Sequence, residues 1–252
     1  MTEKIYIQSI VRAVNILNLF ANNSELRLLD ISKMMKLNKS TTFGILETLV
    51  HLGYLEKNEK SNLYRLGLGL FRISQCIDLE LVHICKPYLL GIAEICKETV
   101  NLIVLEGNHL VYLDKIETQY SIRIGTRIGQ QISVYCSSAG KSILAYMPDK
   151  EVDDILNSIE YIPLTEKTIT NKDKFKNTLN DVRLNGFATD IEEFEKDLIC
   201  IGVPLLGHKG SPLAAITVSA PLYRMNKDRI EKIVGILKEN VLKIATKLGH
   251  EE

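Results

Sequence analysis

Four side chains in the last third of the chain carry groups that enzymes use: Asp190, Glu193, Cys200 and His208. Carboxylates three residues apart could perform acid–base chemistry or bind a metal ion, and a cysteine with a histidine could form a nucleophilic pair. Cys200, however, lies in an apolar stretch without a neighbouring positive charge that would lower the pKa of its thiol. We therefore expect a protein that is not an enzyme, and we assign no catalytic residue.

A second candidate is Gly140-Lys141-Ser142, which has the ending of a phosphate-binding P-loop. That motif requires a glycine five positions before Gly140, and the residue there is Tyr135. Nucleotide hydrolysis is therefore excluded. The remaining feature is a run of small residues, 136–140, at the start of a predicted helix, where free N–H groups favour a carboxylate. Close packing of that helix would explain the same residues.

The cysteines do not indicate a metal site. There are five of them, and no two form a C-x-x-C pair: Cys76, Cys85, Cys96, Cys136 and Cys200. An odd number without such pairs argues against a disulfide framework and against a zinc site built from cysteines alone. We expect no metal and no cofactor, with most of the cysteines in the core.

A different chemistry is predicted near the N-terminus, where Lys39-Ser40-Thr41-Thr42-Phe43 begins a helix. The first turn of a DNA-recognition helix presents small or hydrogen-bonding side chains to the major groove, and its N–H groups can meet a phosphate. Lys39 can neutralise a phosphate, Ser40 and Thr41 can donate hydrogen bonds, and Phe43 can touch thymine methyl groups. Arg65, further along, could reach the DNA backbone. A three-helix module that binds proteins is the alternative.

The elements that must position these residues follow from the hydrophobic spacing. Helices are expected over residues 10–21, with Ile10, Val14 and Leu17 on the core face, over 28–35, and over 38–53 with Asn38 as N-cap. Two short strands around the polar turn 58–61 predict a β-hairpin, which gives the winged form of the helix-turn-helix. Residues 1–75 hold ten Lys or Arg against six Asp or Glu, although the whole chain has net charge zero. A basic first third followed by an acidic remainder is consistent with an N-terminal nucleic-acid-binding domain, the head, joined to a domain with another role.

The rest of the chain predicts a joining helix and an α+β domain. A helix over residues 68–86 connects the two parts and continues beyond Pro87, which could break it. Strands are expected at 100–105, 110–116, 187–191, 198–206 and 213–220, with helices at 138–147, 172–184 and 227–248. We therefore divide the chain into a winged helix-turn-helix domain (1–67), a linker helix (68–86) and a mixed α/β domain (87–252).

An ordered set of segments resembles the isocitrate lyase regulator (IclR) family over nearly the whole chain. In the first third these are residues 9–17 (SIVRAVNIL), 37–42 (LNKSTT) with 46–49, 53–55 (GYL) and 64–67 (YRLG). In the body they are residues 111–117 (VYLDKIE), 139–145 (AGKSILA), 168–170 (TIT), 186–190 (GFATD), 192–194 (EEF) and 200–204 (CIGVP). The set is specific because its members occur in the family's order, whereas any one string would be weak.

The resemblance implies a winged helix-turn-helix joined to a GAF-like domain that binds a small organic acid. It also implies homodimers, which pair into tetramers, on double-stranded palindromic operators. The DNA contacts it implies here are Lys39, Ser40, Thr41, Thr42, Phe43, Gly44 and Arg65. The effector contacts it implies are Ala139, Gly140, Asp190, Cys200, Thr217 and Ser219, with Glu193 as a structural partner nearby.

Three residues of the head depart from the family pattern. Lys36 stands where the turn usually has glycine, and Leu29 replaces a helix-capping Ser or Thr. Gly44 replaces a common arginine on the recognition helix. Base readout should therefore depend more on Ser40, Thr41, Phe43 and the wing, and the operator should differ from those of relatives.

The expected function is a ligand-responsive transcriptional regulator, a repressor of a small-molecule, carbon-catabolic pathway. The alternative is an enzyme or metal-binding protein with an accessory DNA-binding head. No apolar run approaches the roughly 18 residues that would span a bilayer, and the polar start lacks the pattern of a signal peptide. We expect a cytoplasmic protein without membrane contact.

Overall fold

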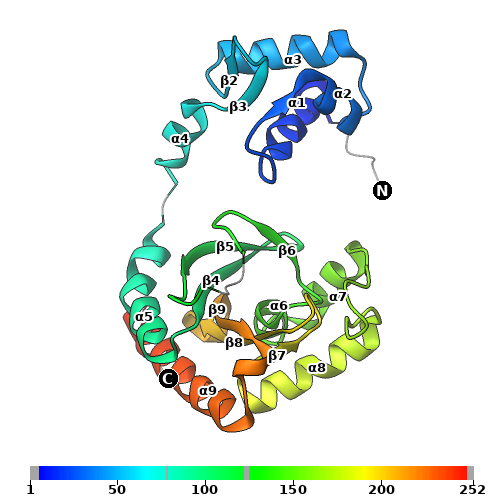
Figure 1. Cartoon of the computed structure of the whole chain (residues 1–252). Helices are drawn as coiled ribbons and strands as arrows, with labels where there is room; N and C mark the ends of the chain where they lie inside the picture. Colours follow the sequence, from blue (N-terminus) through cyan, green and yellow to red (C-terminus); the bar gives the residue numbers. More distant parts are fainter. Residues whose placement is uncertain (1–5, 78, 122–124, 249–252) are drawn as a thin grey trace. The chain divides into compact units, whose positions relative to one another are not determined.

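The structure is a computed structural model that describes residues 6–77, 79–121 and 125–248. The chain forms two compact units, residues 1–78 and residues 79–252, and each is described here by itself (Figure 1). None of the helices in these described ranges is long and apolar enough to cross a lipid bilayer.

The first unit has the three predicted helices and a small antiparallel sheet, and it ends with a short fourth helix, α4 (Leu68–Ser74). The predicted helices are α1 (Gln8–Leu19), α2 (Leu28–Met34) and α3 (Lys39–His51). The predicted hairpin is confirmed as β2 (Leu55–Asn58) and β3 (Leu63–Leu66), and a third strand, β1 (Leu26–Arg27), pairs with β3. The sequence did not predict β1, because two residues carry no alternating pattern.

The buried side of α1 differs from the predicted one. Ile16 and Phe20 are buried in the core of the head, whereas Ile10 and Val14 are 57% and 48% exposed. The helix has two adjacent apolar stripes, and periodicity alone cannot tell which of them is covered. The stripe that holds Ile10 and Val14 therefore lies open in the single chain.

The expected continuous linker helix over 68–86 is wrong. The structure has two helices there, α4 (Leu68–Ser74) and α5 (Glu80–Cys96), and residues 75–77 between them are not helical. The hydroxyl of Ser74 donates to the carbonyl of Phe71, which is the kind of local side-chain bond that competes with helix continuation. Pro87, the residue expected to break the helix, lies inside α5. The boundary between the units falls in this interrupted stretch.

The second unit is built on a six-stranded sheet in the order β6-β5-β4-β9-β8-β7, and all neighbouring strands are antiparallel. The strands are β4 (Thr99–Glu106), β5 (His109–Ile116), β6 (Gln131–Ser133), β7 (Ala188–Ile191), β8 (Leu198–Leu206) and β9 (Pro212–Pro221). The α+β prediction is thus confirmed, and β6 is the one of these six that the sequence pattern did not reveal.

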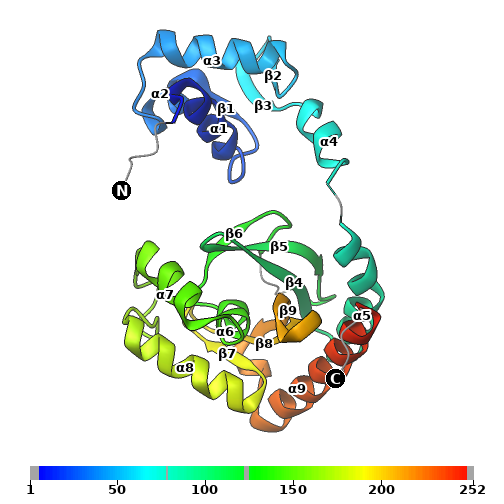
Figure 2. The same cartoon turned by 180° about the vertical axis from the view of Figure 1, so that it is seen from behind.

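Helices cover both faces of this sheet. On one face α5 packs beside α9 (Lys227–Lys247), and both views show the two helices side by side (Figures 1 and 2). On the other face lie α6 (Ser138–Leu144), α7 (Asp149–Ser158) and α8 (Lys172–Asn185), with two 3-10 turns elsewhere, η1 (His208–Gly210) and η2 (Leu222–Arg224). The residues predicted to bind an effector lie on the face that carries α6.

Candidate functional site

The start of α3 is fixed by Asn38, which is the N-cap that the sequence predicts. Its Oδ1 accepts a hydrogen bond from the backbone N–H of Thr41 at 2.8 Å and from Oγ of Ser40 at 3.0 Å. An Asn cap satisfies one of the free N–H groups of the first turn and holds the turn in one geometry. The first turn of α3 is therefore preorganised to present Lys39 and Ser40, both exposed.

The outward face of α3 holds most of the predicted DNA contacts but not Thr42. Phe43 is 46% exposed and Gly44 lies beside it on the surface, while Thr41 is half-buried. Thr42 has no exposed surface, and its hydroxyl donates to the carbonyl of Asn38, so we correct its assignment to a packing residue.

Thr48 continues this face and was missed by the sequence analysis. It is exposed and lies one turn beyond Gly44, whose carbonyl accepts its hydroxyl at 2.8 Å. The signal that could have found it is the helical spacing of four residues from Ser40 to Gly44 to Thr48.

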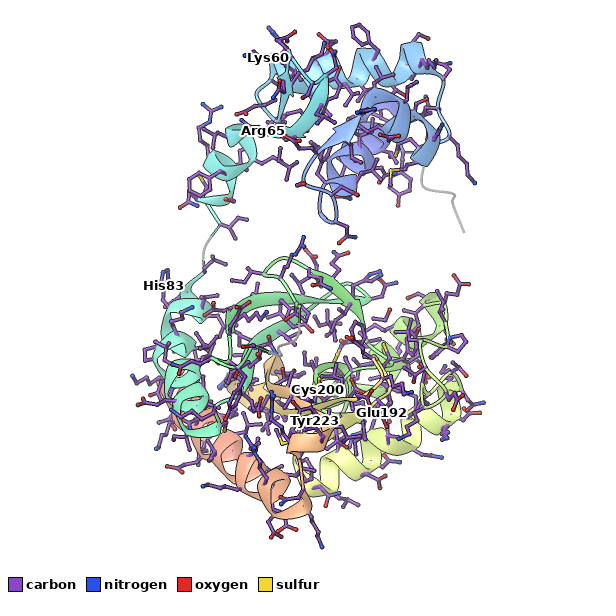
Figure 3. The ribbon with its side chains drawn as sticks, viewed as in Figure 1. Lys60, Arg65, His83, Glu192, Cys200 and Tyr223 are labelled. Atoms are coloured by element: carbon purple, nitrogen blue, oxygen red, sulfur yellow. The ribbon has the colours of Figure 1, made fainter. Side chains whose placement is uncertain are left out.

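The wing is the hairpin β2–β3, and Figure 3 shows Arg65 and Lys60 on it. Arg65 is exposed as predicted, but it is not free: it lies opposite Glu56 in the hairpin, and its Nη2 forms an ion pair with Glu56 Oε2 at 2.7 Å. DNA phosphate would have to compete with this carboxylate for Arg65. Lys60, near the turn, is exposed and is a further cation on the wing.

The turn between α2 and α3 contains the first departure from the family pattern. Lys36 has a φ of 52°, the left-handed conformation that favours glycine. The second departure lies elsewhere than expected, because the N-cap of α2 is Arg27, and Leu29, which is 46% exposed, is the second residue of the helix. Lys36 keeps the turn of the motif at some cost in stability.

In the second unit, three predicted pocket residues lie in one row across the sheet. Asp190 on β7 is opposite Cys200 on β8, and Cys200 is opposite Ser219 on β9. Thr217 precedes Ser219 by two residues and so shares its face. These four residues and Ala139 line one small cavity between the sheet and α6, whose other walls are Ile103, Tyr112, Thr126, Ile132, Ser137, Ser138, Phe194 and Leu198. Figure 3 shows Cys200 in the interior of this unit.

Gly140 does not line that cavity, and its assignment as an effector contact is corrected. A Cβ atom at Gly140 would lie 2.0 Å from the carbonyl oxygen of Val134. Its N–H is taken by the hydroxyl of Ser137, the N-cap of α6. Close helix packing is therefore the reason for a glycine at this position.

Asn101 is the polar residue beside the cavity that sequence reasoning missed. It lies opposite Thr217 in the pairing of β4 with β9, is 1% exposed, and donates from Nδ2 to Thr217 Oγ1 at 3.2 Å and to Ser219 Oγ at 3.3 Å. It belongs to a strand that the sequence does predict. Only the register between β4 and β9, which one sequence cannot supply, brings it next to Thr217.

Within the described parts of the chain, the cation nearest to the cavity in sequence, Lys141, does not line it. Lys141 is buried and donates to the Glu193 carboxylate and, at 3.0 Å, to the carbonyl oxygen of Thr189. Burial raises the pKa of Glu193, and the Lys141 ammonium opposes that rise. Glu193 is thus a partner of Lys141 beside the cavity, as a structural role for Glu193 requires.

Asp190 supplies a carboxyl group to the cavity. It is 1% exposed, and its Oδ1 accepts hydrogen bonds from the N–H groups of Glu193 at 2.7 Å and Phe194 at 3.3 Å. Burial raises its pKa to about 7, against the lowering effect of those hydrogen bonds. Burial also raises the pKa of Cys200, so its thiol stays protonated and is a poor nucleophile. Across the described parts of the chain, no three His, Cys, Asp or Glu side chains are placed to hold a metal ion.

Comparisons with known proteins give two family matches, which together cover most of the chain. The family described as "Bacterial transcriptional regulator IclR C-terminal" matches residues 74–246, and the "IclR helix-turn-helix domain" matches residues 9–59. The HTH-type transcriptional regulator KdgR of Escherichia coli is 30% identical over 98% of this chain and 94% of its own length.

Solved structures show the same fold. The IclR of Thermotoga maritima is 30% identical, with a TM-score of 0.76 over 97% of this chain and all of that one. An IclR homologue from Microbacterium hydrocarbonoxydans, solved with 4-hydroxybenzoate, has a TM-score of 0.81 at 23% identity over 95% of this chain and 98% of its own. These relatives are transcriptional regulators and not enzymes, and this chain belongs to the IclR family of DNA-binding transcriptional regulators.

Proposed function

We propose that the protein is a repressor whose hold on its operator is controlled by a small organic acid bound in the second unit. The single observation that carries this proposal is that Ala139, Asp190, Cys200, Thr217 and Ser219, far apart in sequence, line one cavity. A cavity with an apolar wall and a few convergent polar groups is the usual form of a small-molecule site. The Microbacterium homologue solved with 4-hydroxybenzoate supports an acid as the ligand class.

The DNA side of the proposal assigns the contacts to the exposed face of α3 and to the wing. Lys39 and Ser40 stand at the N-terminal end of α3, where a recognition helix meets phosphate and base edges, and Phe43 and Thr48 extend the face. Thr41, Gly44 and Arg65 complete the set. Because Gly44 has no side chain, we propose that Phe43 and Thr48 provide the readout that an arginine gives in relatives.

The operator-bound form in this proposal is a homodimer, which can pair into a tetramer. A dimer places two recognition helices on the two half-sites of a palindrome. The exposed stripe of Ile10 and Val14 on α1, and exposed Leu68 and Phe71 around α4, supply apolar surface in the first unit that a second copy could cover.

Repression of a carbon-catabolic pathway is the direction of control we favour. Occupancy of an operator suffices for repression, whereas activation also requires a contact with the transcription machinery. The effector would lower operator affinity by binding better to a form that holds the two heads in a different geometry. The protein would act in the cytoplasm, where a bacterial regulator meets its DNA.

The test is operator binding by fluorescence anisotropy, with DNA from the region upstream of the protein's own gene and a random duplex of equal length. We expect at least tenfold preference for the upstream DNA and a steep salt dependence. Ser40→Ala combined with Thr41→Ala should weaken this binding about tenfold or more, with no change in oligomeric state. Ser211→Ala, which removes an exposed hydroxyl from the second unit, is the matched control. Equal affinity for random DNA would overturn the proposed function.

A further inference from the structure

The side-chain amide of Asn101 forms hydrogen bonds with two hydroxyl groups, which packing alone does not require. Its Nδ2 donates to Thr217 Oγ1 and to Ser219 Oγ, at 3.2 and 3.3 Å. Its Oδ1 is buried and has no hydrogen-bond partner among the residues that the structure describes. A buried acceptor without a partner is energetically unfavourable, so its presence in a native protein calls for an explanation.

The direction of the hydroxyl protons follows from this arrangement. A hydroxyl has one proton to donate and lone pairs to accept with. Because Thr217 and Ser219 each accept a hydrogen from Asn101, each must turn its own proton away from the amide. Both hydroxyls line the cavity, so their protons are available to a bound molecule or to the neighbouring Cys200 sulfur.

The orientation of the amide decides which way the hydroxyl protons point. In the structure Nδ2, and not Oδ1, faces the two hydroxyls, so the amide donates to Thr217 and Ser219. In the opposite orientation both hydroxyls would turn their protons toward the amide oxygen instead of the cavity.

We propose that Asn101 is a positioning residue that turns the hydroxyl protons of Thr217 and Ser219 into the cavity, so that the cavity binds a carboxylate through neutral donors. This inference rests on the proposed function and names the group that the effector must carry. Among the residues that the structure describes, no lysine or arginine lines the cavity. The nearby ammonium of Lys141 is held by Glu193 and by the carbonyl of Thr189.

The proposal has a specific chemical consequence, which is discrimination between an acid and its primary amide. A carboxylate offers only acceptors to the two hydroxyl protons. A primary amide of the same shape offers one acceptor and an NH2 group, whose hydrogens would meet other hydrogens. A site built to donate rejects the wrong partner because its own polar groups are then left unpaired.

The experiment compares formate with formamide and pyruvate with pyruvamide, by isothermal titration of the full-length protein at pH 6.5. Formate is the smallest carboxylate and therefore makes the least demand on the cavity, whose volume is about 20 Å³. We expect each acid to bind the unchanged protein at least about tenfold more tightly than its amide. Equal binding of acid and amide, or no binding of either acid, would overturn the proposal.

Asn101→Leu keeps the volume of the side chain but removes the NH2 group that orients the hydroxyls. We expect the ratio of acid to amide affinity to fall to about threefold or less, since each hydroxyl can then turn either way. A merely structural role would weaken both ligands equally and leave the ratio unchanged. Thr217→Val removes one donor at constant shape and should weaken only the acids, which covers the case that Asn101→Leu does not fold. Asn108→Leu, the same substitution in the β4–β5 turn, is the control.

Operator binding without ligand separates this inference from the proposed function. Asn101→Leu should bind the upstream DNA as the unchanged protein does, because Asn101 lies in the second unit. If the unchanged protein does not prefer that DNA, the proposed function fails whatever the ligand results are. If operator binding is specific while the acids bind no better than the amides, only the present inference fails.

Discussion

Glu56 and Arg65 lie opposite each other in the wing, and their side chains form an ion pair with an Nη2–Oε2 distance of 2.7 Å. A second hydrogen bond joins Arg65 Nε to the same carboxylate oxygen at 3.0 Å. Both side chains are exposed, so the pair adds little to stability. Its larger effect should be on DNA binding, because the carboxylate occupies the guanidinium that would otherwise meet a phosphate.

We therefore expect Glu56→Gln to strengthen operator binding about threefold to tenfold in low salt, by freeing Arg65 and by removing a negative charge. Arg65→Gln should weaken binding and reduce the slope of log affinity against log salt by about one. Fluorescence anisotropy between about 50 and 300 mM salt measures both quantities, because phosphate contacts make the affinity depend strongly on salt in this range. Unchanged affinity in both variants would show that the wing does not reach DNA.

Lys36 gives a prediction about the stability of the head. Its φ of 52° costs a non-glycine residue about 1 kcal/mol or more. Lys36→Gly should therefore raise the free energy of unfolding by roughly 0.5–1 kcal/mol, after the greater flexibility of glycine in the unfolded chain is subtracted. Lys36→Ala is the matched control, because alanine has the same difficulty at this φ and should change stability little. Denaturant unfolding measures the difference, and equal effects of the two substitutions would contradict the argument.

Gly140 should not tolerate even a methyl group. Its Cβ would lie 2.0 Å from the Val134 carbonyl oxygen and 2.7 Å from its carbon, and neither atom belongs to a flexible side chain. Gly140→Ala should destabilise the second unit by about 3 kcal/mol or more, through forced backbone movement. Gly235→Ala is the control in the middle of α9, where a Cβ meets nothing within 4 Å. It should stabilise by up to about 1 kcal/mol, because alanine is the better helix former.

The sequence predicted the parts of the fold that depend on local pattern. The cap of α3, the ranges of α3 and α9, and the hairpins β2–β3 and β4–β5 were found because each is encoded by neighbouring residues. The break between α4 and α5 was missed because no glycine or proline lies at residues 75–77. Local composition there permits a helix, so the pattern did not indicate its end.

The site was predictable only as far as the resemblance extends. Five of the six predicted pocket residues line the cavity. The sixth, Gly140, does not line it and instead allows α6 to pack closely against Val134. Asn101 could not have been found, because its partners Thr217 and Ser219 are more than a hundred residues away and depend on the register of β4 with β9. Thr42 was misassigned although the spacing of Thr42, Leu46 and Leu49 predicts that all three face the core, because the resemblance counts the whole start of the helix as DNA contacts.

Asp190 gives a prediction with a defined sign in pH. Burial raises the pKa of this carboxyl from 3.8 to about 7 in the folded protein. Between these values the unfolded chain loses the proton and the folded protein keeps it, so this group lowers stability progressively as pH rises from about 4 to about 7. Above that range both states are ionised and the loss is complete.

Asp190→Asn removes the ionisation but keeps an oxygen that can accept from the N–H groups of Glu193 and Phe194. The variant should match the unchanged protein near pH 4.5 and be more stable at pH 8 by roughly 2–4 kcal/mol. Asp153→Asn is the control with the opposite sign, since hydrogen bonds from Lys172 and Lys176 lower the pKa of that exposed carboxyl and its ionised form is the favoured one. Urea unfolding at pH 4.5, 6 and 8 measures the differences. A constant difference between Asp190→Asn and the unchanged protein at all three pH values would mean that Asp190 is ionised in the folded state throughout, which would contradict the raised pKa.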